Sequence, residues 1–285
     1  LSRKNIFLLF TFVFLFYCAI DIGSMWDAGT HLQMGKNKLN YLFSLGNNSN
    51  DFWFSKYFPG VSYTITAFIT SMFPKIFETE ALHLVNLLIS LSAVYGMYGI
   101  SKNLFNKKVA QIVFILFLFY PIFLGQMAIN PKDTIITVSY VWITYLTLKY
   151  LQNPKKYQKN KLFLIKISFL LTIGTGINLA FSAILIPLII FILLEFLFFK
   201  KIINKYFSGK IFIYDLLLII LFSFLILIPF WPQTHSNILV MPFKIFYESI
   251  FKYQPIGTPA YILNGEIKLV TNTPINYIPL NFLYK

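Results

Sequence analysis

Long apolar stretches dominate this sequence and leave it few folds to adopt. They fall at about residues 5–21, 81–100, 109–127, 134–151, 162–178, 179–199 and 211–231. A helix needs about 20 residues to span the hydrocarbon core of a bilayer. The run from 162 to 199 is too long for one span, and Gly174, Gly176 and Asn178 in "GTGIN" favour a turn within it. The sequence therefore predicts an all-α integral membrane fold, a polytopic bundle of about seven transmembrane helices.

Composition excludes an ordinary soluble domain. Of the 285 residues, 57% are hydrophobic, 33 are Phe and only 12% are charged, so a soluble fold would expose large apolar patches. The single cysteine, Cys18, lies in the first apolar run, which rules out intrachain disulfides and thiolate metal sites. The sequence contains no Walker loop, GxGxxG fingerprint or Cys/His zinc pattern. ATP-driven pumping and dinucleotide redox chemistry therefore have no support.

The basic residues indicate the orientation of the chain in the membrane. Fifteen of the 24 Lys and Arg residues lie in alternate connections: Arg3, Lys4, Lys102, Lys107, Lys108, Lys149, Lys155, Lys156, Lys159, Lys161, Lys166, Lys200, Lys201, Lys205 and Lys210. The positive-inside rule makes this side cytoplasmic. Basic clusters beside spans also suit an anionic membrane leaflet, so the net charge of +14 does not require nucleic acid as a partner.

The acidic residues gather on the opposite side. Eight of the ten lie outside in this topology: Asp21, Asp27, Asp51, Glu78, Glu80, Asp133, Glu248 and Glu266. Only Glu195 and Asp215 lie on or near the inner half. We interpret the outer face as the working face, and expect a multi-pass protein of the bacterial inner membrane or an equivalent membrane, with its active site on the extracytoplasmic side.

Two outer segments are long, and they define the expected domains. Residues 1–231 form a transmembrane core that includes the outer loop 22–80, and residues 232–285 form an extracytoplasmic loop. The chain begins with Leu1 rather than Met, and its last residues resemble the start of another apolar run. We therefore expect a fragment whose C-terminal region is missing.

Two amphipathic helices are predicted within the loop 22–80. In the first, Leu32, Leu39, Leu42 and Phe43 recur at helical spacing with polar residues between them. A second is predicted at 61–73, where Ile65, Phe68, Ile69 and Met72 share one face. Helices of this kind lie in the membrane interface.

Asp27 is the first candidate for chemistry. It follows the outer end of the first span, where a partly desolvated carboxylate is a functional candidate and could accept a proton as a general base. The alternative is a solvated aspartate that caps the first amphipathic helix. Asp21 is a weaker rival that suits the end of the first span.

The motif "AINPKD", residues 128–133, forms the predicted outer turn between the third and fourth spans. Asn130 and Pro131 end the third helix, and Asp133 suits the N-cap of the fourth. In a functional interpretation, Lys132 meets a phosphate and Asp133 helps to hold a sugar or a metal.

Three further residues are candidates with strong structural alternatives. His31 and His83 lie on the outer side, and neither has the spacing of a metal ligand pair. Trp231, in "PFWPQTH", ends the seventh span, where an aromatic anchor at the interface explains it fully.

These motifs, in this order, resemble glycosyltransferase family 39 of the GT-C class, which includes protein O-mannosyltransferases and lipid A aminoarabinose transferases. The resemblance covers essentially the whole chain. It is carried by "WDAGTHLQMGK", by "MAINPKD", and by a late passage with Pro229, Trp231, Pro232, Gly265, Pro274 and Tyr277.

The resemblance implies roles for individual residues. Asp27 matches the catalytic acid of the first outer loop, Asp133 matches the acid after the third span, and Lys132 precedes it. The chain departs from the family at three places. Ala28 stands where many members have a second acid, His83 where many have Arg, and Asn178 where a basic residue is frequent. With these departures, the candidate residues for binding the donor are Lys132, Asp133, His31, His83, Asn178 and Trp231.

The activity implied is an inverting sugar transfer from a polyprenyl-phosphate donor to an acceptor hydroxyl on a protein, lipid or glycan. Asp27 takes the proton of the acceptor, and Lys132 meets the leaving phosphate. The resemblance makes no cofactor certain, and a divalent metal held by Asp27 and Asp133 stays open. Two other hypotheses stay open as well: a transporter or flippase, which predicts inverted repeats and charges near the bilayer midplane, and a catalytically inactive scaffold.

Overall fold

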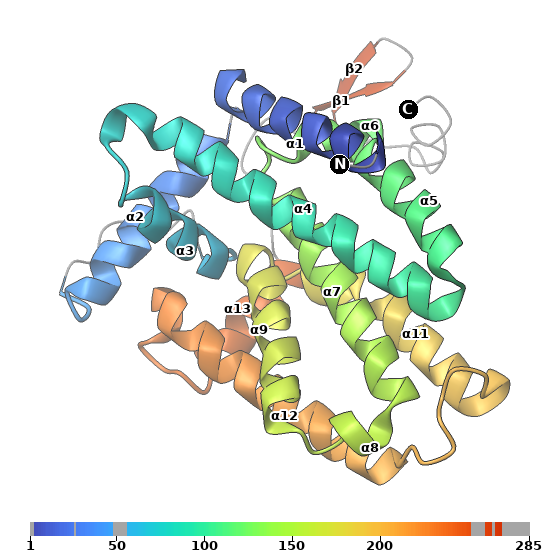
Figure 1. Cartoon of the computed structure of the whole chain (residues 1–285). Coiled ribbons are helices and arrows are strands. Elements are labelled where there is room, and N and C mark those ends of the chain that lie inside the picture. Colours follow the sequence, from blue (N-terminus) through green and yellow to red (C-terminus); the bar gives the residue numbers. More distant parts are fainter. Residues whose placement is uncertain (1–2, 26, 48–55, 252–259, 264–265, 270–285) are drawn as a thin grey trace. The chain divides into compact units, whose positions relative to one another are not determined.

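The computed structural model of the chain describes residues 3–25, 27–47, 56–251, 260–263 and 266–269 (Figure 1). Two compact units, Leu1–Phe246 and Tyr247–Lys285, are considered separately. Asp51 and three residues of the late motif, Gly265, Pro274 and Tyr277, fall outside the described residues.

Helices make up almost all of the first unit. They are α1 (Arg3–Asp21), α2 (Ala28–Phe43), α3 (Val61–Thr70), α4 (Glu78–Leu104), α5 (Lys107–Leu118), α6 (Pro121–Gln126), α7 (Asp133–Gln152), α8 (Pro154–Tyr157), α9 (Lys161–Ile177), α10 (Phe181–Ile184), α11 (Ile186–Leu194) and α12 (Gly209–Leu227). Helix α13 (Met241–Phe251) crosses the boundary between the units, and a π-helical turn, Glu195–Phe199, follows α11. The second unit contains an antiparallel hairpin of β1 (Ala260–Leu263) and β2 (Glu266–Leu269), in which Ala260 pairs with Leu269.

The helical membrane architecture predicted from the sequence is confirmed. Within the described residues, three helical segments are long and apolar enough to cross a membrane: Lys75–Leu104, Phe181–Phe199 and Gly209–Phe230. Helices also occupy the other predicted spans. The number of seven spans stays a prediction.

Two predicted boundaries have clear physical causes. Helix α9 ends at Ile177, as the "GTGIN" motif predicts, and the Asn178 Oδ1 accepts a hydrogen bond from the Ala180 N–H at 2.9 Å. The predicted third span, 109–127, is divided into α5 and α6 at Pro121, the first residue of α6. Because proline lacks an N–H and clashes with the preceding turn, this stretch is not one straight helix.

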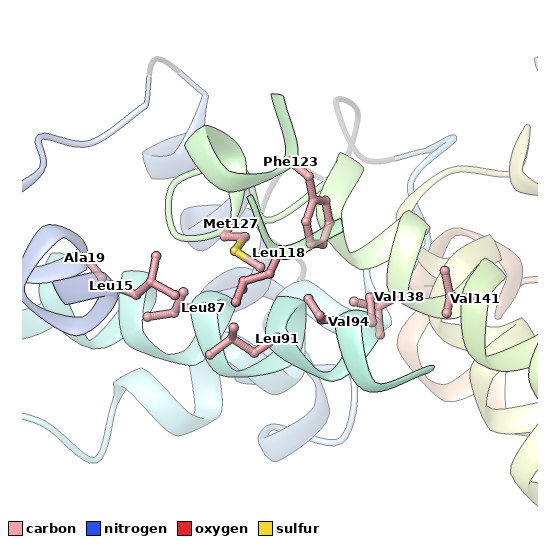
Figure 2. Packing of buried hydrophobic residues seen from close by; sticks show 11 residues of the cluster. Leu15, Ala19, Leu87, Leu91, Val94, Leu118, Phe123, Met127, Val138 and Val141 are labelled. Carbon is pink, nitrogen blue, oxygen red and sulfur yellow. The ribbon is translucent and has the colours of Figure 1, made fainter. Parts of the chain in front are cut away.

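The main hydrophobic cluster surrounds α4, which lies beside α1 and against α7 in Figure 1. Figure 2 shows Leu15 of α1 close to Leu87 of α4, and Phe123 and Met127 above the same helix. Van der Waals packing of this kind, rather than a hydrophobic driving force, holds helices together in lipid.

Small hydroxyl residues add hydrogen bonds where α9 meets α12. The Ser168 Oγ donates to the Ile219 carbonyl at 3.1 Å, and the Thr172 Oγ1 lies 3.0 Å from the Ser223 carbonyl. Interhelical bonds from Ser and Thr are a common means of fixing helix pairs in membranes.

Helices α2 and α3 pack against each other in the predicted outer loop, near the start of α4. Both predicted amphipathic helices are therefore confirmed as helices. The buried face of α2 is Ala28, His31, Gly35 and Lys38. The predicted apolar face flanks it, with Leu32 half-buried and Phe43 exposed. On this buried face Gly35 lies where α3 approaches closely, because a Cβ on Gly35 would collide with the Tyr63 carbonyl.

The segment 56–60, which leads into α3, is tied to three other parts of the first unit. The buried Lys38 Nζ donates to the carbonyls of Phe58 and Pro59 at 2.8 and 2.6 Å. The Gly60 N–H donates to the Gly176 carbonyl at the end of α9. The Trp231 Nε1–H donates to the Lys56 carbonyl at 3.0 Å. We call this segment the strap; it connects α2, α9 and the end of α12.

Asp215 and Glu195, the two acids predicted for the inner half, contact the lysine-rich connections. The Asp215 Oδ2 accepts from the Tyr150 hydroxyl at 2.7 Å and from the Lys159 N–H at 2.9 Å. The Glu195 Oε2 accepts from the N–H groups of Lys201 and Ile202. Both carboxylates are almost fully buried, and both accept hydrogen bonds from backbone N–H groups of these loops.

Candidate functional site

Asp27 precedes α2, and its carboxylate faces the next turn of that helix. The residue occupies the N-cap position, but its side chain accepts no capping hydrogen bond. Instead, the Asp27 Oδ2 lies 4.0 Å from the His31 Nε2, and 37% of the Asp27 side chain is exposed. The capping alternative therefore does not explain this carboxylate, which is open to a reactant.

His31 is held against Tyr63 of α3. Their rings stack with centroids 4.6 Å apart and planes 5° from parallel. Both residues are buried, and both carry a polar atom without a hydrogen-bond partner in the described part of the chain, the His31 Nδ1 and the Tyr63 hydroxyl. Because unpaired buried polar groups are costly, this pair is a natural place for a ligand that supplies hydrogen bonds.

Charges from two separate connections act on this pair. Burial lowers the pKa of His31; the charges of Asp27 and Asp133 oppose that shift, and Lys132 adds to it. Burial also raises the pKa of Tyr63, with further contributions from Asp27 and Asp133. Tyr63 of α3 also packs with Ile135 of α7, which brings α3 close to the helix that follows the "NPKD" turn. His31 is neutral there, because the loss of solvation penalises its charged form.

Asn130 organises the "NPKD" turn. Its Oδ1 accepts hydrogen bonds from the N–H groups of Lys132 and Asp133 at 3.1 and 3.0 Å. Its Nδ2 donates to the Asp133 Oδ2 at 3.0 Å and to Gln126. The prediction that Asp133 is the N-cap of α7 is therefore wrong. Asn130 supplies the capping oxygen, and Asp133 begins the helix with an exposed carboxylate held in place.

A buried amide on α4 supports this turn from behind. The Asn86 Nδ2 donates to the carbonyls of Met127 and Ala128 at 3.0 and 3.1 Å, and the Ser90 Oγ donates to Met127 as well. These bonds satisfy carbonyls left unpaired where α6 ends. The turn is thus fixed to the long helix α4 rather than free to move.

The other predicted site residues lie elsewhere. His83 is buried in α4, and its Nδ1 lies 3.1 Å from the Ala19 carbonyl of α1. Asn178 forms the turn after α9. Trp231 is 2% exposed and packs with Val61 and Leu179. The expectation that Trp231 anchors at an interface is wrong, because its indole is enclosed. Within the described residues, no hydrogen bond or ion pair joins these three residues to Asp27, and donor binding by them stays a prediction.

Three important residues were not predicted from the sequence. Tyr63 lies in an apolar stretch, and Lys38 is one of the polar residues between the apolar positions of the first amphipathic helix. Asn86 carried a usable signal, since an amide within a predicted span seeks a partner there.

The acids of the site do not form a cage for a metal. Within residues 3–25, 27–47 and 56–251, no group of three or more His, Cys, Asp or Glu residues could hold an ion. Asp27 and Asp133 act on the same tyrosine, yet a third protein ligand is missing from this set. A metal at Asp27 and Asp133 stays a prediction.

Comparison with known proteins identifies the family. The family model described as "Dolichyl-phosphate-mannose-protein mannosyltransferase" matches residues 59–231, which is more than half of the chain and runs from the strap to Trp231. No curated protein and no solved structure matches the chain. The matched segment contains Tyr63, which stacks on His31, and the turn residues Asn130, Lys132 and Asp133. The chain belongs to the dolichyl-phosphate-mannose-protein mannosyltransferase family, and it is a membrane glycosyltransferase of the GT-C type.

Proposed function

We propose that this membrane glycosyltransferase moves a sugar from a polyprenyl-phosphate donor to an acceptor hydroxyl on the extracytoplasmic face, with Asp27 as the base. One observation carries the proposal: Asp27 lies 4.0 Å from His31, His31 stacks on Tyr63, and Tyr63 packs with Ile135 of α7, the helix that Asp133 begins. The connections that contribute these residues lie on the side opposite the lysine-rich loops, which is the outer side by the positive-inside rule. We place the protein in a bacterial inner membrane or its equivalent.

The proposed reaction is a single displacement. The half-exposed Asp27 carboxylate accepts the proton of the acceptor hydroxyl while that oxygen forms a bond to the anomeric carbon. The bond from that carbon to the phosphate oxygen breaks, and the configuration inverts. The phosphate leaves with the bonding electrons, so its charge grows in the transition state. Lys132 is the cation that stabilises this charge.

The surrounding groups suit this chemistry. The His31 Nε2 lies 4.0 Å from the Asp27 Oδ2, so this imidazole can help to orient the base. The His31 Nδ1 and the Tyr63 hydroxyl are buried without a hydrogen-bond partner among the described residues, and a sugar that reaches them would supply one. Asp133, fixed by Asn130, provides a second carboxylate for the sugar. The donor arrives through the lipid phase, so no nucleotide-binding loop is needed.

The direct test is Asp27→Asn in isolated membranes supplied with a panel of radiolabelled polyprenyl-phosphate sugars. General-base catalysis contributes about 10²–10⁴-fold in rate, so we expect a loss of that size for the sugar that wild type transfers. Asp21→Asn, at the exposed end of α1, is the matched control and should retain activity. Full activity of Asp27→Asn, with normal insertion, would rule out Asp27 as the base.

A further inference from the structure

A groove of about 370 Å³ lies between α1, α4 and α5, apart from the candidate site. Phe7 and Leu8 of α1 and Phe114 of α5 supply apolar walls, and Tyr95 of α4 meets Phe114 edge to face with ring centroids 5.4 Å apart. Phe7 and Tyr95 are each more than half exposed. In a membrane these exposed walls face lipid rather than water, and a hydrocarbon chain is the natural occupant of such a groove.

One end of the groove is polar. Lys107 and Gln111 both line it, and they are one turn apart on α5, which places them on one face of the helix. Lys107 is exposed and Gln111 half-buried. Neither side chain has a hydrogen bond or ion pair within the described residues. The groove therefore combines an apolar channel with an unpaired cation and an unpaired amide.

The charge around the groove has one sign. The sequence contains no Asp or Glu in residues 1–20 or 81–132, which include most of α1 and α4 and all of α5. The connection from α4 to α5 carries Lys102, Lys107 and Lys108. An anion beside Lys107 would therefore meet no nearby carboxylate from these three segments. This arrangement discriminates against a neutral or cationic occupant.

We propose that this groove binds one anionic phospholipid, with an acyl chain along Phe7, Leu8 and Phe114 and its phosphate at Lys107 and Gln111. Hydrogen bonds from the ammonium and the amide reach the phosphate oxygens, and the net negative headgroup distinguishes this lipid from a zwitterionic one. The site is separate from sugar transfer, and the phosphate chemistry is the same in either leaflet. With the proposed orientation, the lipid belongs to the cytoplasmic leaflet.

The test is competition between two lipids, measured by native mass spectrometry of the full chain in detergent. The protein is mixed with equal amounts of phosphatidylglycerol and phosphatidylcholine with the same acyl chains. Wild type should retain phosphatidylglycerol preferentially, with one molecule held most strongly. Lys107→Gln should reduce that preference about fivefold, since one Lys near an anionic surface contributes about 1 kcal/mol.

Lys108→Gln is the matched control, because Lys108 is the next residue and does not line the groove. It should reduce the preference less than twofold. Ile115→Trp is a second variant, which narrows the groove and leaves Lys107 in place; it should lower retention of both lipids. Helix content by circular dichroism confirms that each variant is folded.

Two results would overturn the proposal. One is equal retention of the two lipids by wild type. The other is an equal effect of Lys107→Gln and Lys108→Gln, which would indicate a diffuse surface charge instead of a site. Sugar transfer is assayed on the same preparations, so a failure of lipid binding is distinguishable from a failure of the proposed enzymatic function.

Discussion

Lys38 should make the stability of this protein depend on pH in a way that a surface lysine cannot. Its amine is fully buried, and burial lowers its pKa to about 7. The geometry explains why: the neutral amine has two N–H groups, and the carbonyls of Phe58 and Pro59 accept both. An ammonium would bury a third N–H, for which no acceptor is found among the described residues.

The magnitude follows from linkage. The unfolded lysine has a pKa near 10.5, so between pH 7 and pH 9 the unfolded chain holds a proton that the folded chain releases. The free energy of unfolding therefore rises with pH, by about 2 kcal/mol over this interval. Lys38→Met keeps the length of the side chain but leaves two buried carbonyls unpaired, each at a cost of about 1–3 kcal/mol.

Thermal unfolding in detergent at pH 7, 8 and 9 measures both effects. At pH 9, where keeping Lys38 neutral costs least, Lys38→Met should unfold at a lower temperature than wild type. The melting temperature of wild type should rise by about 4–8 °C relative to that of Lys38→Met between pH 7 and pH 9. Lys36→Met is the control on the same helix, since the Lys36 Nζ is half-exposed and paired with Glu78 at 2.6 Å. The difference in melting temperature between Lys36→Met and wild type should stay constant from pH 7 to pH 9. Parallel pH profiles for wild type and Lys38→Met would refute the reasoning.

Two further variants probe the candidate site. Asn130→Ala removes the cap of α7 and the donor to Asp133, so we expect a loss of about 1–2 kcal/mol in unfolding free energy together with slower sugar transfer. Asn130→Asp restores only the acceptor. An active, fully stable Asn130→Asp would show that the donor to Asp133 is dispensable. His31→Gln keeps a donor near the Nε2 position and should retain more activity than His31→Asn. Because burial lowers the pKa of His31, the pH profile of the wild-type transfer rate should show no step near pH 6.5. A step at that pH in wild type that disappears in His31→Gln would contradict a neutral His31.

Much of the fold could be predicted because lipid imposes a simple rule on the sequence. Helices such as α4 and α12 follow from apolar length alone, since each backbone group in the membrane must be satisfied within its own segment. The break at Pro121 was visible as a proline, but the apolar length around it suggested one span. The hairpin β1–β2 was not predicted, although the sequence "AYILNGEIKL" places Asn-Gly between two short runs, which is a usual signal for a hairpin.

The site was predictable in its charged members and not in its buried ones. Asp27, Lys132 and Asp133 were recognised from their places after predicted spans and from the family resemblance. Tyr63 could not be found this way, because a tyrosine in an apolar stretch looks like any other lipid-facing aromatic. The N-cap was assigned to Asp133 although Asn130 is equally suited by residue type, and only the hydrogen bonds decide between them.

The strap also affects when α2 and α3 can be anchored during synthesis of the chain. The hydrogen bond from Trp231 to the Lys56 carbonyl joins residues 175 positions apart. At about 5–20 residues per second, a ribosome produces Trp231 roughly 10–35 s after Lys56. Throughout that interval α2 and α3, with Asp27 beside them, lack their anchor to the end of α12. A nascent chain halted before Trp231 would thus lack the hydrogen bond that joins the strap to the residues after α12, and the segments around the candidate site would be only partly anchored.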